Sequence, residues 1–420
     1  MSRALNRRGH PSPPRVVWLP IVALLIAGAW SVVVRSLCAE QGETGQTLAA
    51  QCVALPASHR PYGCIIAAGD RLLVGGRGGI AILSSADLSS RGISAVTGSV
   101  LSMSRTKHGI LYTSCRAGDD ITTPTAHGHV GHVPLAPGEP GEAPREIETP
   151  FVATNVLTVS GGDDAWCCAF AQRKIIKVRF TGQLERQEEI SFGFHPYVAV
   201  GLQGDTVLAA GVSSLPSNRG EVALATAHLG ATDSPRLLEL PRGFRSGGFV
   251  CDVTVLGSTR VVARRVPPDP PLLFTLSESG LSVQQVDTPD LGYHIDWIGI
   301  GGHDSRAVIV GKATKVQPDA SALAIALSGC QEATTQGGPL LKTEVALWDT
   351  ALREQRLCAG LLVGGLVTGA FSPDGEQLYL LFPERSLVVS LRLEDLAHGT
   401  TLRRAKPSLE EAGRRVPAAE

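Results

Sequence analysis

The sequence predicts an all-β fold, a β-propeller of about seven four-stranded blades, preceded by one N-terminal transmembrane or signal segment. Glycine (47 residues) and proline (27) are scattered through all 420 residues, which is typical of short strands joined by tight turns. A strand–turn–strand pattern also recurs at intervals of about 50 residues. The hydrophobic content of 43% supports a large core, and the formal net charge of -1 argues against a nucleic-acid binder.

The N-terminus predicts export. Residues 1–15 hold four arginines and no acidic residue, and residues 16–34 are uncharged and about as long as a bilayer requires. A basic lead of this kind stays in the cytoplasm while the chain after the apolar segment crosses the membrane. We therefore expect a cytoplasmic lead at 1–15, a transmembrane anchor or signal segment at 16–34, and a tether at 35–46. The folded domain is then membrane-anchored and periplasmic or extracellular, or secreted if the segment is cleaved.

The repeat is clearest near the C-terminus. Residues 344–349 end in Trp348 and Asp349, and a later strand reaches Ser-Pro-Asp-Gly at 372–375 before an apolar strand at 377–382. Proline presets such a turn and glycine accepts positive φ, so we expect Asp374 to brace the turn and Trp348 to pack inside its blade. This lettering, over residues 344–393, resembles the repeats of WD-type and YVTN-type propellers. The resemblance implies a propeller of the seven-bladed class.

The same pattern recurs upstream with weaker lettering. The six further hairpin turns lie at 69–70, 107–109, 162–164, 204–205, 257–258 and 302–304. Outer strands are expected at 175–180, 184–190, 221–228, 237–240, 272–276 and 281–286. A strand at 47–55 would close the ring, which gives a propeller over 47–396, a loop inserted at 328–341 and a flexible charged tail at 397–420. A large sandwich is the alternative, and the regular spacing disfavours it.

Nine cysteines in an exported chain suggest disulfides. The preferred pairs are Cys52–Cys64, which bracket the start of the folded region, and Cys330–Cys358, which flank the insertion. The alternative is that several cysteines are small apolar core residues, as expected for Cys251. Adjacent Cys167 and Cys168 would point to opposite faces of one strand and would not bond each other.

Three histidines are the main candidate for metal binding. His127 and His129 would share one face of a strand, with His132 close by, and imidazoles suit zinc or copper. A polar loop or outer strand is the favoured interpretation, so no metal and no cofactor is predicted. Gly75–Gly79 lacks a following helix and is interpreted as a hairpin loop.

The sequence contains no recognised catalytic motif. We therefore expect an exported, membrane-tethered interaction module that binds a protein, peptide or glycan, with membrane contact through its N-terminal segment and no nucleic-acid partner. The alternative is an exported enzyme. The resemblance then implies a lactonase-like hydrolase or an amine-dehydrogenase-like oxidoreductase, with its site at the central funnel. The candidate residues there are Asp252, His195, Asp296 and His303.

Overall fold

The computed structural model describes most of the chain from residue 47 onward, and it divides the chain into one unit at 1–45 and a compact unit at 46–420. The described residues are 47–56, 59–116, 118–135, 144–158, 164–180, 184–202, 205–213, 221–230, 234–240, 250–256, 260–265, 271–277, 282–287, 293–300, 306–313, 324–328, 343–349, 354–361, 366–394 and 401–403. The predicted export segment, His303 and Cys330 lie outside them. No helix within these ranges is long and apolar enough to cross a membrane.

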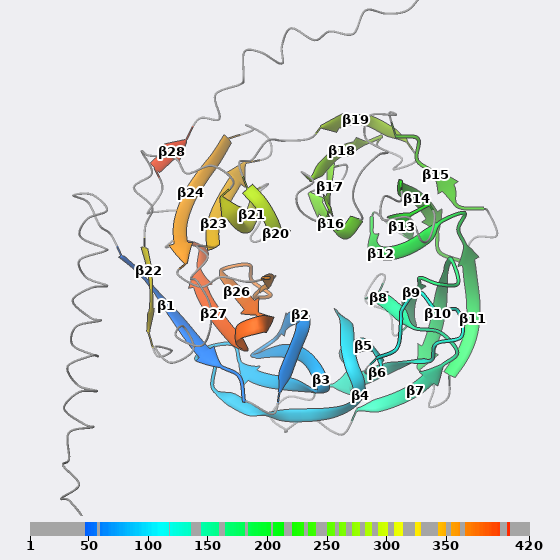
Figure 1. The fold of residues 1–420 in the computed structure, drawn as a ribbon, viewed down its shortest axis with the longest axis horizontal. Coiled ribbons are helices and arrows are strands. Elements are labelled where there is room, and N and C mark those ends of the chain that lie inside the picture. Colours follow the sequence, from blue (N-terminus) through cyan, green and yellow to red (C-terminus); the bar gives the residue numbers. More distant parts are fainter. Residues whose placement is uncertain are drawn as a thin grey trace, which may run out of the picture. The chain divides into compact units, whose positions relative to one another are not determined.

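Residues 46–420 form an all-β propeller, with antiparallel sheets arranged around a central axis (Figure 1). Three sheets have four strands each, in chain order from the centre outward. They comprise β8 (Ala153–Thr158), β9 (Asp164–Ala169), β10 (Lys174–Phe180) and β11 (Leu184–Ser191); β12 (His195–Gly201), β13 (Thr206–Val212), β14 (Val222–His228) and β15 (Arg236–Leu237); and β16 (Val250–Leu256), β17 (Arg260–Arg265), β18 (Leu272–Leu276) and β19 (Val283–Asp287).

The sheet that precedes them has six strands because two strands are long. It comprises β2 (Arg60–Ala68), β3 (Arg71–Ser84), β4 (Ser90–Arg105), β5 (Gly109–Cys115), β6 (Gly128–Pro134) and β7 (Arg145–Thr149). The first half of β3 pairs with β2 and its second half with β4, while the second half of β4 pairs with β5. Gly78 has a φ of 74°, and the Ser85 N–H donates to the Asp70 carbonyl at 3.0 Å, so β3 turns back on itself. The turn falls within the predicted Gly75–Gly79 hairpin loop.

The remaining sheet has ten strands and closes the ring. It comprises β20 (Tyr293–Ile300), β21 (Arg306–Ala313), β23 (Thr343–Asp349), β24 (Glu354–Leu361), β25 (Thr368–Phe371), β26 (Gln377–Phe382), β27 (Leu387–Arg392) and β1 (Thr47–Ala54), with β22 (Ala324–Ser328) and β28 (Thr401–Arg403). The predicted closing strand is confirmed, because β1 pairs antiparallel with β27. β22 lies parallel to β1 and to β24, and β28 pairs with β24.

The strands that flank each predicted first turn pair with each other, but the blade count differs. Each predicted first hairpin corresponds to a pair of strands: β2–β3, β4–β5, β8–β9, β12–β13, β16–β17, β20–β21 and β25–β26. When the ten-stranded sheet is divided at β22, the described strands form six blade sheets and not the seven predicted. The continuous strand β4 joins the first two predicted blades into one sheet, which is the physical reason for the difference.

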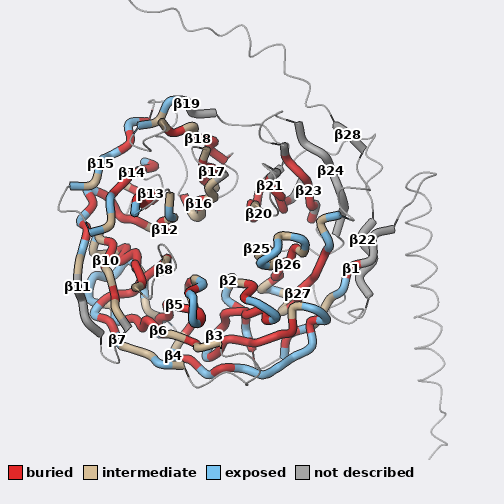
Figure 2. Tube along the Cα trace, turned by 180° about the vertical axis from the view of Figure 1, so that it is seen from behind, coloured by how far each residue is buried: buried red, intermediate tan, exposed pale blue. Residues whose placement is uncertain are grey.

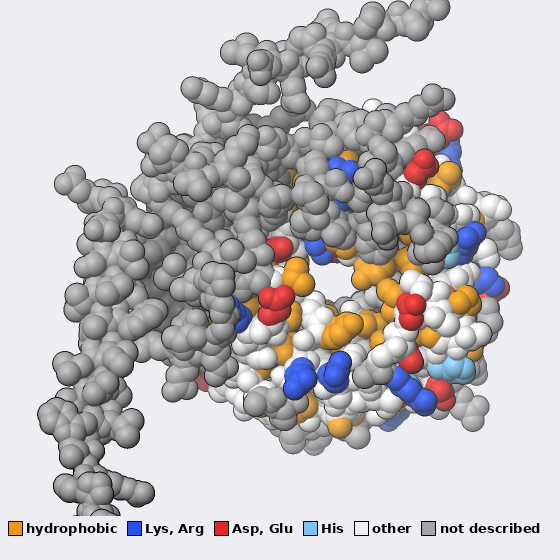
Figure 3. Space-filling model, in the orientation of Figure 1, with side chains coloured by type: hydrophobic (Ala, Val, Ile, Leu, Met, Phe, Trp, Pro, Cys, Tyr) orange, Lys and Arg blue, Asp and Glu red, His pale blue; other side chains and the backbone are white. Residues whose placement is uncertain are grey.

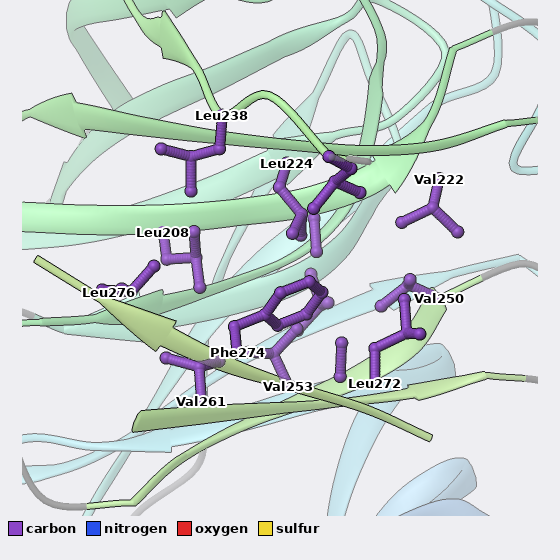
Figure 4. Close-up of a cluster of buried hydrophobic side chains, with 14 residues drawn as sticks. Leu208, Val222, Leu224, Leu238, Val250, Val253, Val261, Leu272, Phe274 and Leu276 are labelled. Carbon is purple, nitrogen blue, oxygen red and sulfur yellow. The ribbon is translucent and has the colours of Figure 1, made fainter. Parts of the chain in front are cut away.

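Neighbouring sheets hold together through apolar cores and through their inner strands. The inner strands contact one another in cyclic order, from β2 through β4, β8, β12, β16, β20 and β25 back to β2. Figure 4 shows the core between the sheets of β12 and β16, where Leu208 and Leu224 pack against Phe274. Burial of each such side chain contributes about 1.5–3 kcal/mol. Figure 2 shows buried positions concentrated along the middle strands.

Cys167 and Cys168 lie on opposite faces of their strand, as predicted, but the predicted Cys52–Cys64 disulfide is not formed. Cys167 and Cys168 enter different cores, which places them on opposite faces of β9. Cys64 is a free thiol, so it is not bonded to Cys52. Cys52 lies on β1 beside β27, whereas Cys64 lies on the inner strand β2 and its Sγ donates to the Val100 carbonyl at 3.6 Å. The second predicted pair includes Cys330 and the Cys358 side chain, which are outside the described residues.

Trp297 joins β20 to β25. Its indole lies 5.6 Å from the Phe371 ring, centroid to centroid, at an interplanar angle of 40°. A Cβ at Gly299 would overlap this indole and approach the Phe371 ring to 2.9 Å. Glycine at this position therefore permits the stacking that fixes two neighbouring inner strands. Trp348 is buried in the adjacent core, as predicted.

We predict that Gly299→Ala lowers the free energy of unfolding by about 1–3 kcal/mol, because the added methyl must displace packed rings. The matched control is Gly201→Ala, since a Cβ at Gly201 on the inner strand β12 meets no atom within 4 Å. Urea denaturation of both variants measures the effect. Equal changes in the free energy of unfolding of the two variants would contradict this account of the packing between β20 and β25.

Candidate functional site

A β-bulge marks the start of the inner strands. The pairing register shifts after Pro61, Val100, Ala153, Pro196, Val250 and Ile295, on six of the described strands. A bulge leaves a residue outside the ladder and re-aims its side chain, and bulges are frequent at barrel rims and beside active sites. The residues skipped by the register include Tyr62, Leu101, Asn155, Tyr197, Cys251 and Asp296, which we name the bulge ring.

Hydrogen bonds link the bulges of neighbouring strands. Asn155 Nδ2 donates to Ser102 Oγ at 3.4 Å, and Thr154 Oγ1 donates to the Tyr197 carbonyl at 2.6 Å. The Ala199 N–H donates to Asn155 Oδ1 at 3.2 Å. These bonds join equivalent positions of β4, β8 and β12, so the bulges lie at one level of the channel. Figure 3 shows the central opening, edged by hydrophobic side chains with acidic and basic groups among them.

Tyr197 is the centre of a cluster within this ring. Its ring meets Phe170 edge-on with centroids 5.9 Å apart. Burial raises the pKa of Tyr197, and the nearby Cys251, Tyr62 and Asp252 raise it further, whereas Arg264 lowers it. The Tyr62 side chain lies in the same electrostatic neighbourhood and is 56% exposed. We name Tyr62, Tyr197, Cys251, Asp252 and Arg264 the mouth cluster.

Asp252 and Arg264 face each other across β16 and β17. Burial raises the pKa of Asp252, although the Arg264 charge and a 2.8 Å hydrogen bond from the Val253 N–H oppose this shift. Burial likewise raises the pKa of Cys251, whose Sγ donates to the Arg264 carbonyl at 3.5 Å. Arg264 Nε is buried and has no hydrogen-bond partner in the described structure. The mouth cluster therefore holds a perturbed carboxyl group beside an incompletely used guanidinium.

Both ring nitrogens of His195 are engaged by neighbouring residues of the fold. Its Nε2 accepts from Arg173 Nε at 3.1 Å, and its Nδ1 lies 3.0 Å from the Phe170 carbonyl. This arrangement requires the neutral tautomer with the proton on Nδ1. Burial lowers the pKa of His195, and the Arg173 charge lowers it further against the Phe170 hydrogen bond.

The other predicted site residues are separated. Asp296 belongs to the bulge ring and is 7% exposed. His303 is outside the described residues. His127 is exposed beside Glu148, while His129 is buried on β6. Within the described ranges, no group of three His, Cys, Asp or Glu side chains is placed to hold a metal ion.

Sequence reasoning found Asp252 but missed the rest of the mouth cluster. The available signal was positional: a polar, aromatic or thiol side chain recurs near the third residue of the inner strands, as in Tyr197 and Cys251. This signal is weak in a single sequence, because the strand alternation would have assigned these residues to a blade core. The bulge that exposes them is visible only in the register.

Comparisons with known proteins support the fold alone. No family model and no curated protein matches the chain. Hydrazine synthase of Kuenenia stuttgartiensis is similar at 12% identity and a TM-score of 0.52, over 81% of this chain and 97% of that chain. The Cps50 (Swd1) β-propeller domain of Myceliophteria thermophila is similar at 10% identity and a TM-score of 0.55, over 81% of this chain and 98% of that chain. A streptogramin B lyase is similar at 11% identity and a TM-score of 0.52, over 84% of this chain and 97% of that chain.

We predict that the free energy of unfolding falls as the pH drops below 6.5, because His195 and His59 both have lowered pKa values in the fold. The unfolded imidazoles bind protons first, and each contributes a slope of up to about 1.4 kcal/mol per pH unit. His195→Phe should reduce this slope and leave the part due to His59. The exposed His127→Asn variant is the control. Urea titrations between pH 5 and 7.5 test this, and an unchanged slope in His195→Phe would contradict it.

Proposed function

We propose that this chain is an exported, membrane-tethered β-propeller that binds a protein or peptide partner at the mouth of its channel. The observation that carries the proposal is the bulge ring, where exposed Tyr62 stands beside a partly buried cluster on a rigid scaffold. Tyrosine supplies a large amphipathic contact at low entropic cost and is enriched at binding hot spots. The hydrogen bonds between bulges favour a preformed surface.

Two structural neighbours agree with a binding role. One is the Cps50 (Swd1) propeller domain, and another is a chain in the mitotic checkpoint complex, similar at 8% identity with a TM-score of 0.51. Such distant likeness transfers no partner to this chain. The likeness supports the proposal only through the propeller fold, whose loops and channel mouth can serve as contact surfaces.

We also infer that the ring has seven blades. Each inner strand starts its own outward series of strands, and the cyclic contact order includes both β2 and β4. The reversal of β3 at Gly78 supplies the middle strands of a first blade, and the outer part of β4 completes it. The second half of β4 then begins the next blade with β5, β6 and β7. The six-stranded sheet would thus contain two blades.

An enzymatic role is the second candidate, favoured by the raised pKa of the Asp252 carboxyl beside the Cys251 thiol in a channel mouth. Hydrolysis of a lactone would need a group that activates water, and Asp252 is the residue positioned for that role. Activity of the wild-type protein that Asp252→Asn abolishes would favour this candidate over the binding module.

We predict that a photo-reactive amino acid at position 62 crosslinks the native partner in cells, because Tyr62 is exposed at the mouth. The control is position 237 on the outer strand β15, where the leucine is 62% exposed. Crosslinks at 62 and none at 237 are expected on denaturing gels. Crosslinks at 237 alone would move the binding surface to the outer rim and contradict the proposal.

We predict that export depends on residues 1–34. An alkaline phosphatase fused after Glu420 becomes active only in an oxidising compartment, so the full chain should give an active fusion. Deletion of residues 2–34 should abolish this activity and leave the protein inside the cell. Carbonate extraction of the full chain tests the anchor, since a retained span stays with the membrane pellet. An active fusion after the deletion would contradict the export proposal.

A further inference from the structure

The mouth cluster contains a buried hydrogen-bond donor that the described protein does not use. Arg264 Nε is buried without a hydrogen-bond partner, which is costly in a low-dielectric environment unless a ligand or water supplies an acceptor. The Tyr62 and Tyr197 phenols lie in the same electrostatic neighbourhood, and a phenol O–H is a hydrogen-bond donor. A site with these groups is complementary to an acceptor that carries negative charge.

The charge of the neighbours limits the kind of anion. Asp252 lies directly across from Arg264, and Asp296 lies on β20, which contacts both β16 and β17. The Asp252 carboxyl group beside the guanidinium opposes a dianion such as phosphate more strongly than a single negative charge. A carboxylate carries one charge and matches the planar guanidinium through two parallel hydrogen bonds. The site therefore favours a carboxylate.

The surroundings of the carboxylate site are aromatic. Phe170 meets the Tyr197 ring edge-on, and Tyr62 is 56% exposed. Ring pairs of this geometry favour a further aromatic or apolar group over a purely polar one. The ligand thus combines a carboxylate with an apolar body, which is the chemistry of a peptide that ends in, or presents, an acidic group beside an apolar side chain.

We propose that the mouth cluster binds the carboxylate of a peptide segment, with Arg264 as its charged partner and the Tyr62 and Tyr197 rings against the adjacent apolar side chain. This inference rests on the proposed function and specifies its partner chemistry. It assigns opposite effects to the two charged residues of the cluster. Arg264 attracts the ligand, whereas Asp252 opposes it.

The test uses the full-length chain and two probes, N-acetylphenylalanine and its neutral amide, in calorimetric titrations. The acid should bind about tenfold tighter than the amide or more, because a charge-assisted pair replaces a neutral contact. Arg264→Gln should remove this preference, and Asp252→Asn should strengthen binding of the acid. Tyr197→Phe keeps the ring and should weaken binding of the acid by a smaller factor than Arg264→Gln does. The control Arg392→Gln removes an equal charge from the outer part of β27 and should change nothing.

The outcomes separate this inference from the proposed function. Equal binding of acid and amide, or a preference that survives Arg264→Gln, would overturn the carboxylate site while crosslinking at position 62 could still succeed. Absence of any binding by the acid would overturn it in the same way. Loss of both probe binding and crosslinking would overturn the two together. Tighter acid binding by Asp252→Asn, with loss in Arg264→Gln, is the result that supports the assignment.

Discussion

The pairing of β1 with β27 is the constraint on which the rest of the structure depends. Residues Gln51–Ala54 lie antiparallel to Leu387–Ser390, so the N-terminal strand completes the last blade. Without this pairing the ring would have two open ends, each with unpaired backbone groups and one uncovered apolar face. Ala50 and Cys52 of β1 pack against the core of that blade, so closure adds burial to its hydrogen bonds.

The bulge ring depends on this closure. The inner strands of neighbouring blades are joined by hydrogen bonds close to the bulges. Thr154 bonds the backbone of β12, and Thr254 bonds the Ile298 carbonyl of β20 at 3.1 Å. Such bonds keep their length only while neighbouring blades keep their angle. Closure thereby transmits rigidity from the rim to the channel mouth, where a binding surface needs it.

The sequence predicted the fold better than the site, for a physical reason. The Asp374 turn was readable because its chemistry is local: the Glu376 N–H donates to Asp374 Oδ1 at 3.0 Å, and Gly375 takes a φ of 73°. The closing strand could be predicted because a propeller ring is commonly closed by pairing an N-terminal strand with the last blade. The electrostatic neighbourhood of Tyr197, which includes Tyr62 of β2 and Cys251 of β16, depends on bulges and blade angles, which no short window encodes. The Cys52–Cys64 prediction failed for a similar reason. The two residues are close in sequence, but Cys52 lies on β1 in the last sheet and Cys64 lies on β2 in the first.

The incompletely used Arg264 guanidinium argues that the mouth is shaped for a ligand and not for stability. Elsewhere the protein pairs its charges: Asp164 accepts from Arg179 at 3.0 Å and lies 3.2 Å from Lys177. An apolar residue at position 264 would remove the unpartnered donor, but it would also remove the positive charge beside the buried Asp252 carboxyl. The unpartnered Arg264 Nε thus lies in a residue opposite Asp252, next to a bulge that interrupts the ladder. In the proposed complex the carboxylate of the ligand would accept a hydrogen bond from Arg264, which is the behaviour expected of a preorganised binding surface.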